Sequence, residues 1–164
     1  MTRSNIMHSL TAVAALVLYA VPLTAQGQSA QDRLWDAAIA GDTSAIARAL
    51  RDGARIDSMD TRSARNGRLA LNWAALNNHS AAITLLLAKG APLEGENLTG
   101  FSALHHAAEV GALDAARTLL AAGADPTHAN VQGRLPAETA EALGHPEVAA
   151  LLRAAKKPQP RSGV

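Results

Sequence analysis

The sequence predicts an all-α repeat solenoid of about four units, each a pair of helices followed by a hairpin loop. Several columns of residues recur along the chain with a period of roughly 33 residues, and apolar residues within a unit recur three and four positions apart. Aromatic residues are only 2% of the chain, whereas much of the 48% apolar fraction is alanine. Because alanine favours thin layers of closely packed helices, the composition agrees with the period.

The period is carried by independent columns rather than by one shared motif. Two kinds of paired small residues recur at matching intervals: Gly-Ala at 53–54, 90–91 and 123–124, and Ala-Ala at 37–38, 74–75 and 107–108. The leucines at 86, 119 and 152 are 33 residues apart, so they carry the period into the last unit. Several columns that share one period indicate a stacked repeat.

The clearest unit shows how each element follows from its residues. The segment 101–110 is rich in small residues and predicts a short first helix, which Gly111 ends because positive φ is cheap for glycine. The segment 113–122 has apolar residues three and four apart and predicts a second helix, which Gly123 ends. Such a helix pair cannot bury its apolar face alone, so it must stack on neighbouring units.

These residues resemble the ankyrin repeat. The family pattern is a glycine, then Thr-Pro-Leu-His-x-Ala-Ala, Gly-His, Leu-Leu and Gly-Ala-Asp. The best copy here reads Gly100-Phe-Ser-Ala-Leu-His-His-Ala-Ala, Gly111-Ala, Leu119-Leu120 and Gly123-Ala-Asp125. The resemblance covers residues 31–155, in units at 31–63, 64–96, 97–129 and 130–155. The outer two units are degenerate, as expected of terminal repeats that present a polar face to water.

The segment 1–25 has the three parts of a secretory signal peptide. Arg3 gives a basic start, residues 10–21 form an apolar run, and Ala25 ends a small-residue segment. This pattern predicts a periplasmic or secreted protein, with 26–30 as a short linker and 156–164 as a flexible tail. The alternatives are an uncleaved anchor, which would make a membrane-tethered scaffold, and a buried core helix. The apolar run is short of the roughly 20 residues that span a bilayer.

Charge and residue types exclude several function classes. From residue 26 onward the chain has equal numbers of basic and acidic side chains, so nothing indicates nucleic acid or an anionic membrane as a partner. The chain has no cysteine, which excludes disulfides, thiolate zinc sites and cysteine nucleophiles. No phosphate-cradling glycine loop or serine elbow occurs, so the sequence predicts no small-molecule substrate and no cofactor.

The histidines are the candidates for catalysis or metal binding. His105 and His106 are adjacent, and neighbours on a helix point about 100° apart, so they cannot chelate one ion as an i, i+4 pair can. The resemblance implies that His105 braces a hairpin and that His79 and His145 are structural too. His128 is expected to be solvated. We predict no enzyme and no metal, with a small periplasmic hydrolase around His105 and His106 as the rival hypothesis.

The resemblance implies a concave surface that binds a protein partner. The hairpins, called fingers below, contribute Arg65, Asn66, Arg68, Leu98, Thr99, Phe101, Val131, Gln132 and Arg134. The first helices contribute Leu76, Asn77, Glu109 and Val110. Phe101 is expected to be an exposed anchor between Arg68 and Arg134, with packing against the adjacent finger as the alternative. The resemblance to signal-bearing bacterial ankyrin proteins, some encoded near peroxide-detoxifying enzymes, also implies stress protection.

Three further features complete the predictions. The stretch between Gly53 and Gly67 is four residues longer than that between Gly90 and Gly100, and the excess within 57–66 predicts a longer polar finger. Asn97-Leu-Thr99 matches the acceptor pattern for N-glycosylation. Trp73 is expected either to pack between units or to show one edge in the groove.

Overall fold

The computed structural model describes residues 27–62 and 66–155. The predicted signal peptide at 1–25, the predicted tail at 156–164 and Arg65 lie outside the described residues. The described chain forms eight α-helices and no strand: α1 (Ala30–Ala40), α2 (Thr43–Arg51), α3 (Ala70–Leu76), α4 (Ser80–Ala88), α5 (Ala103–Val110), α6 (Leu113–Ala121), α7 (Pro136–Ala142) and α8 (Pro146–Ala154). None of these helices is long and apolar enough to cross a membrane.

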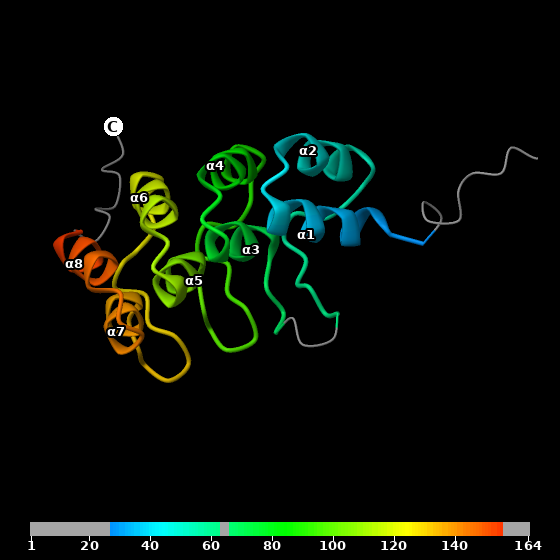
Figure 1. Ribbon diagram of the computed structural model, residues 1–164. Helices are drawn as coiled ribbons and strands as arrows, with labels where there is room; N and C mark the ends of the chain where they lie inside the picture. The colour runs from blue at the N-terminus through cyan, green and yellow to red at the C-terminus, as the bar shows by residue number, and fades with distance from the viewer. Residues whose placement is uncertain (1–26, 63–65, 156–164) are drawn as a thin grey trace, which may run out of the picture.

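The helices stack as four pairs, which confirms the predicted all-α repeat solenoid. Figure 1 shows α1, α3, α5 and α7 as an inner layer, with the fingers projecting from its side, while α2, α4 and α6 form an outer layer. Leu86, Leu119 and Leu152 are at most 2% exposed, so this leucine column lies in the core as its period indicates. Alanines fill most of the remaining buried positions, which lets adjacent helices approach closely.

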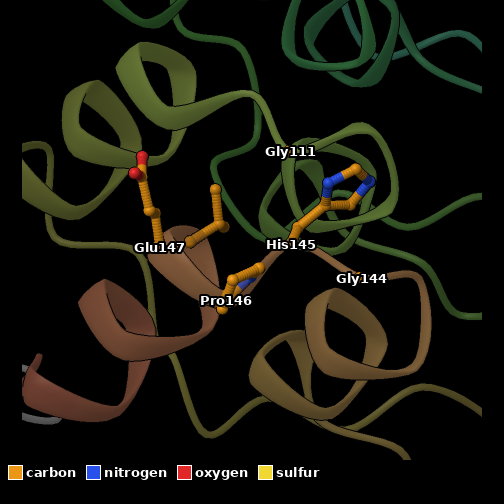
Figure 2. A pocket seen from close by; sticks show the side chains of 6 residues that line it. Gly111, Gly144, His145, Pro146 and Glu147 are labelled. Carbon is orange, nitrogen blue, oxygen red and sulfur yellow. The ribbon is translucent and has the colours of Figure 1, made fainter.

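Glycines at the turn between paired helices leave room for a histidine of the next unit. Gly41 and Gly111 have φ of 72° and 69°, and a Cβ at Gly111 would lie 2.6 Å from Nδ1 of His145. Figure 2 shows the His145 ring beside Gly111, in a small pocket at the start of α8. His79 lies against Gly41 in the same way, and its Nε2 is 3.0 Å from the Ile39 carbonyl oxygen.

At one junction between units, the contact between a glycine and a histidine is replaced by a different contact. Asn78 stands where the other units have a glycine and adopts a φ of 56°, while the following unit has Ala112 where a histidine would stand. The small Ala112 leaves space that Asn78 fills, and the Asn78 side-chain oxygen accepts a hydrogen bond of 2.9 Å from the Ala115 N–H. Asn78 therefore satisfies a free donor in the first turn of α6 from the neighbouring unit.

We expect Asn78→Gly to lower the free energy of unfolding by roughly 0.5–2 kcal/mol, the usual loss of a helix cap. Glycine keeps the left-handed backbone, so the substitution removes the cap without adding strain. Urea unfolding measures the loss. Asn78→Asp is the control, because it retains the acceptor, and it should stay close to wild type. Equal stability of Asn78→Gly and wild type would show that the cap contributes nothing.

Ion pairs lie in the first and in the last unit of the stack. Arg33 on α1 lies 2.7 Å from Asp52 after α2, and Arg153 on α8 pairs with Glu141 on α7 through both guanidinium nitrogens. Glu141 and Arg153 stand one repeat period after Ala108 and Leu120, so inner apolar columns become charged in the last unit. Exposed ion pairs add little stability, so these pairs mainly make the two terminal units polar.

Candidate functional site

The base of each complete finger is closed by a buried asparagine. The side-chain oxygen of Asn97 accepts the backbone N–H groups two and four residues later, both at 2.9 Å. Asn130 makes the same pair of bonds at 3.0 and 2.9 Å. These bonds fix the backbone of the fingers, so the side chains on them are presented in one arrangement. Because the Asn97 side chain is only 4% exposed, the folded chain does not offer it for glycosylation.

A second column connects each first helix to the finger that follows. His105 is fully buried, and its Nε2 lies 3.0 Å from the Arg134 carbonyl oxygen. Asn72, one unit earlier, donates to the Phe101 carbonyl at 3.1 Å, and Trp35 donates to the Ser58 carbonyl at 3.2 Å. An imidazole, a carboxamide and an indole thus donate an equivalent hydrogen bond from the same position of successive units. The predicted structural role of His105 is confirmed.

His106 lies at the centre of a polar chain between the fingers and α5. Its Nδ1 is 3.0 Å from the Glu109 carboxylate, and its Nε2 is 3.4 Å from Nδ2 of Asn97. Since the asparagine nitrogen only donates, Nε2 accepts and Nδ1 carries the proton donated to Glu109. The neutral ring is 1% exposed. The hydrogen bond from His106 lowers the pKa of Glu109, which keeps this carboxylate ionised.

Trp73 packs between units rather than showing an edge in the groove. It is 6% exposed, and the Arg68 guanidinium lies over its ring, 4.9 Å from the centroid. Arg68 itself is 16% exposed and 4.0 Å from Glu109. The indole N–H of Trp73 donates to the Asp60 carboxylate at 3.1 Å. Arg68 is therefore used to cover a tryptophan and to balance a carboxylate.

The described part of the long segment 57–66 is anchored to the first helices. Asp60 is fully buried, and the Arg62 side chain donates to it at 2.9 and 2.8 Å. Arg62 also donates to Asp36 on α1 at 2.8 Å and lies over the Trp35 ring. Hydrogen bonding to Asp60 raises the pKa of Arg62, so the guanidinium stays charged. Over the described residues, the predicted longer polar finger is therefore held to α1 and α3.

The remaining candidates divide by exposure. The exposed ones are Asn66, Asn77, Leu98, Val110, Val131, Gln132 and Arg134. The half-buried ones are Arg68, Leu76, Thr99, Phe101 and Glu109. No group of three or more His, Asp or Glu side chains in the described chain is placed to hold a metal.

Comparison with known proteins identifies the repeat. The family model described as ankyrin repeats (3 copies) matches residues 34–130, more than half of the chain. The chain belongs to the ankyrin-repeat family. Among curated proteins it is similar to the mouse (Mus musculus) B-cell lymphoma 3 protein homolog, with 38% identity over 96 residues, and to mouse protein phosphatase 1 regulatory subunit 27, with 37% identity over 98 residues.

The likeness to these two ankyrin proteins is partial. The matches cover 58% and 60% of this chain, but only 21% of the first relative and 62% of the second. The chain thus spans less than two thirds of either relative. The family model matches the repeat array, so the comparisons establish the family and leave the partner to be inferred from the residues of this chain.

Two expectations from the sequence, one for Phe101 and one for His128, need correction. Phe101 is not an exposed anchor, because its half-buried ring packs against His105 and His106 at centroid distances of 5.1 and 5.6 Å. It packs against two histidines on α5 of its own unit. His128 is only partly solvated, since its side chain is 28% exposed and hydrogen-bonds to Glu96.

Sequence reasoning missed one exposed residue. Leu143 at the end of α7 is 53% exposed and stands one repeat period after Val110, which is 44% exposed. It belongs to the same column of the ankyrin first helix and extends the apolar surface by one unit. The period could have found it, but the terminal unit was expected to be polar and the column was not continued into it.

The buried histidines predict a pH-dependent stability. Burial lowers the pKa of His105 and His106 below the ordinary value of 6.5. The unfolded chain therefore binds protons that the folded chain does not, and stability decreases as the pH falls below about 6.5. We expect a slope of up to about 1.4 kcal/mol per pH unit for each histidine, measured by urea unfolding between about pH 7 and pH 5.

The control for this titration is His106→Gln, which should retain only the part of the slope that His105 contributes. The titration of Glu109 affects stability only at lower pH, because the hydrogen bond from His106 lowers the pKa of this carboxyl below its ordinary value of 4.5. An identical slope in the variant and in wild type would show that His106 does not titrate with unfolding.

Proposed function

We propose that this chain is a non-catalytic protein-interaction module that binds a protein partner through the concave surface of its fingers and first helices. The observation that carries the proposal is the placement of exposed residues on a fixed backbone. Leu98 and Val131 project from fingers that Asn97 and Asn130 hold closed, and Val110 and Leu143 are exposed on the first helices. Exposed apolar side chains on a rigid scaffold favour recognition of another protein.

The second mouse relative supports this proposal, because it is described as a regulatory subunit of a phosphatase. The hydrolase alternative loses its candidate base. Nε2 of His105 faces a backbone carbonyl oxygen and its Nδ1 faces Ser102, while both ring nitrogens of His106 are occupied by Glu109 and Asn97. A general base needs a ring nitrogen free to meet substrate, which neither ring offers.

A pull-down from the native compartment tests the concave surface. Val110→Arg places a bulky charge on α5 at the proposed surface, and Ala121→Arg places the same residue at an exposed position on α6 in the outer layer. We expect Val110→Arg to lose the proteins captured by wild type and Ala121→Arg to retain them. Loss with Ala121→Arg alone would move the interface to the outer layer and contradict the proposal.

The compartment is proposed to be the periplasm or the secreted space, with stress protection as the process. The signal-like start of the sequence supports export. N-terminal sequencing of the protein from its native host should begin at Gln26 or Gln28. A mature chain that begins at Met1 in the cytoplasm would contradict export, and one that begins at Met1 in a membrane fraction would support the tethered scaffold instead.

A further inference from the structure

The amide of Asn97 makes contacts on both of its sides. Its Oδ1 accepts hydrogen bonds from the Thr99 N–H, the Thr99 hydroxyl and the Phe101 N–H, each at 2.9 Å, and these bonds close the finger at 97–101. Its Nδ2 lies 3.4 Å from Nε2 of His106 on α5. Because Nδ2 only donates, this orientation of the amide requires that Nε2 carries no proton.

A proton on Nε2 of His106 is incompatible with this orientation. Nδ1 already donates to Glu109, so a proton taken up from solvent adds to Nε2, where it meets the donor Nδ2 of Asn97. Both side chains are at most 4% exposed, and two unpaired donors are costly where water is excluded. Turning the amide over presents Oδ1 to the imidazolium. Nδ2 then faces the N–H groups of Thr99 and Phe101, and the bonds that close the finger are lost.

The groups around His106 keep its ring neutral at neutral pH. Burial is the largest effect and lowers the pKa of His106 below its ordinary value of 6.5. The Glu109 carboxylate favours the charged ring, and the Arg68 guanidinium opposes it. The titratable and charged groups that face the ring or its neighbour are Glu109 and His105 on α5, Arg68 before α3, and the pair of Glu96 and His128, which packs against His105. The ring therefore takes up its proton only on acidification.

The last finger has the same closure without a titratable partner. Asn130 accepts the N–H groups of Gln132 and Arg134 at 3.0 and 2.9 Å. Thr139 stands one repeat period after His106, and its hydroxyl donates to a backbone carbonyl oxygen four residues earlier. Acidification therefore leaves the bonds that close finger 130–134 unchanged.

The finger base of the preceding unit shows what a donor on the first helix requires. Asp60 holds the position of Asn97 in that unit, and Trp73 stands one repeat period before His106. One carboxylate oxygen of Asp60 accepts the indole N–H at 3.1 Å, and the other accepts the backbone N–H two residues later at 3.1 Å. A carboxylate has acceptors on both sides, so it meets a donor from the helix and keeps the backbone bond, whereas a carboxamide does not.

We propose that protonation of His106 turns over the Asn97 amide and opens finger 97–101, while finger 130–134 stays closed. The arrangement makes one finger of the folded repeat array sensitive to acid. The position of Leu98, which this finger exposes, becomes dependent on pH. The inference goes beyond the proposed function, because it needs no partner and its effect is measured on the free protein.

Amide hydrogen exchange of the full chain, followed by NMR at about pH 7, 6 and 5, tests the proposal. An opening that binds one proton shifts its equilibrium by up to about tenfold per pH unit below about pH 6.5. Protection of the Thr99 and Phe101 amides, corrected for the intrinsic pH dependence of exchange, should fall by about tenfold or more over this range. Protection of the Gln132 and Arg134 amides should change by less than about threefold. A parallel fall in both fingers would show that acid acts on the whole domain and would overturn the proposal.

Two variants assign the effect to the two side chains. His106→Thr installs the residue that the last unit has at this position, and protection of Thr99 and Phe101 should then lose its pH dependence. Asn97→Asp should keep the finger closed beside the charged ring, as Asp60 does beside a donor, so protection should no longer fall with pH. A wild-type response to acid in either variant would contradict the proposal.

His128→Gln is the matched control for the histidine variant. His128 is a partly exposed histidine that pairs with Glu96, the residue before Asn97, so it lies close to the same finger. This variant should open finger 97–101 on acidification as wild type does. Loss of the response in His128→Gln would assign the effect to His128 and overturn the role of His106.

Discussion

Replacing Leu119 with alanine is expected to lower the free energy of unfolding by about 2–5 kcal/mol. Leu119 is fully buried and belongs to the leucine column that fills the space between helix layers in successive units. The surrounding alanines have no long side chains that could collapse into the vacated space. Chemical denaturation followed by circular dichroism measures the loss.

Leu98→Ala is the matched control for the core prediction. It removes the same atoms from a side chain that is 68% exposed, so its cost should stay near that of an ordinary surface change, within about 0.5 kcal/mol. Similar losses in the two variants would mean that burial does not distinguish the two positions, and the assignment of the leucine column to the core would be wrong.

Replacing Asp60 with alanine is expected to cost roughly 2–4 kcal/mol, because it removes the buried acceptor that joins the long segment to α3. The indole N–H of Trp73 and the backbone N–H of Arg62 would both lose their partner. The Arg62 side chain would keep only Asp36 at hydrogen-bonding distance. Urea unfolding monitored by tryptophan fluorescence reports both the stability and the environment of Trp73.

Asp57→Ala is the control for the buried carboxylate. Asp57 lies in the same segment, but its partner Arg55 is 76% exposed, and exposed pairs contribute little. We expect near-wild-type stability for this variant. If Asp60→Ala were equally harmless, the long segment would not be anchored by its carboxylate.

The period in the sequence was sufficient to predict the fold. Helix pairs that share one period must repeat one packing arrangement, so Leu86, Leu119 and Leu152 could be assigned to one core column. The role of His105 was likewise predicted through the family pattern. Both are properties that recur in every unit, and recurrence is visible in a single sequence.

Features that break the recurrence could not be predicted in the same way. The exchange between Asn78 and Ala112 depends on the space between two units, which no spacing within one unit reveals. The attachment of the described part of 57–66 to α1 depends on Arg62 reaching Asp36. Both contacts depend on the direction of a side chain, which is set only when the helices and fingers pack together.

The positions of the candidate surface residues in the repeat could be predicted, but the exposure of each side chain could not. Leu98, Val131 and Arg134 are exposed as expected. Phe101 shares the column of Arg134, yet it packs inward because two neighbouring histidine rings offer a surface for an aromatic ring. The same column thus has an exposed arginine in one unit and a half-buried phenylalanine in another, so the identity of the side chain decides its direction.

Amide hydrogen exchange on the complex with the captured partner tests the central claim most directly. Comparison of free and bound protein should show slower exchange in the fingers, at 97–101 and 130–134, and little change in α2, α4 and α6. Protection in the fingers is the result that the concave binding surface predicts. Protection confined to α4 and α6, with the fingers unchanged, would place the partner on the outer layer and contradict the account.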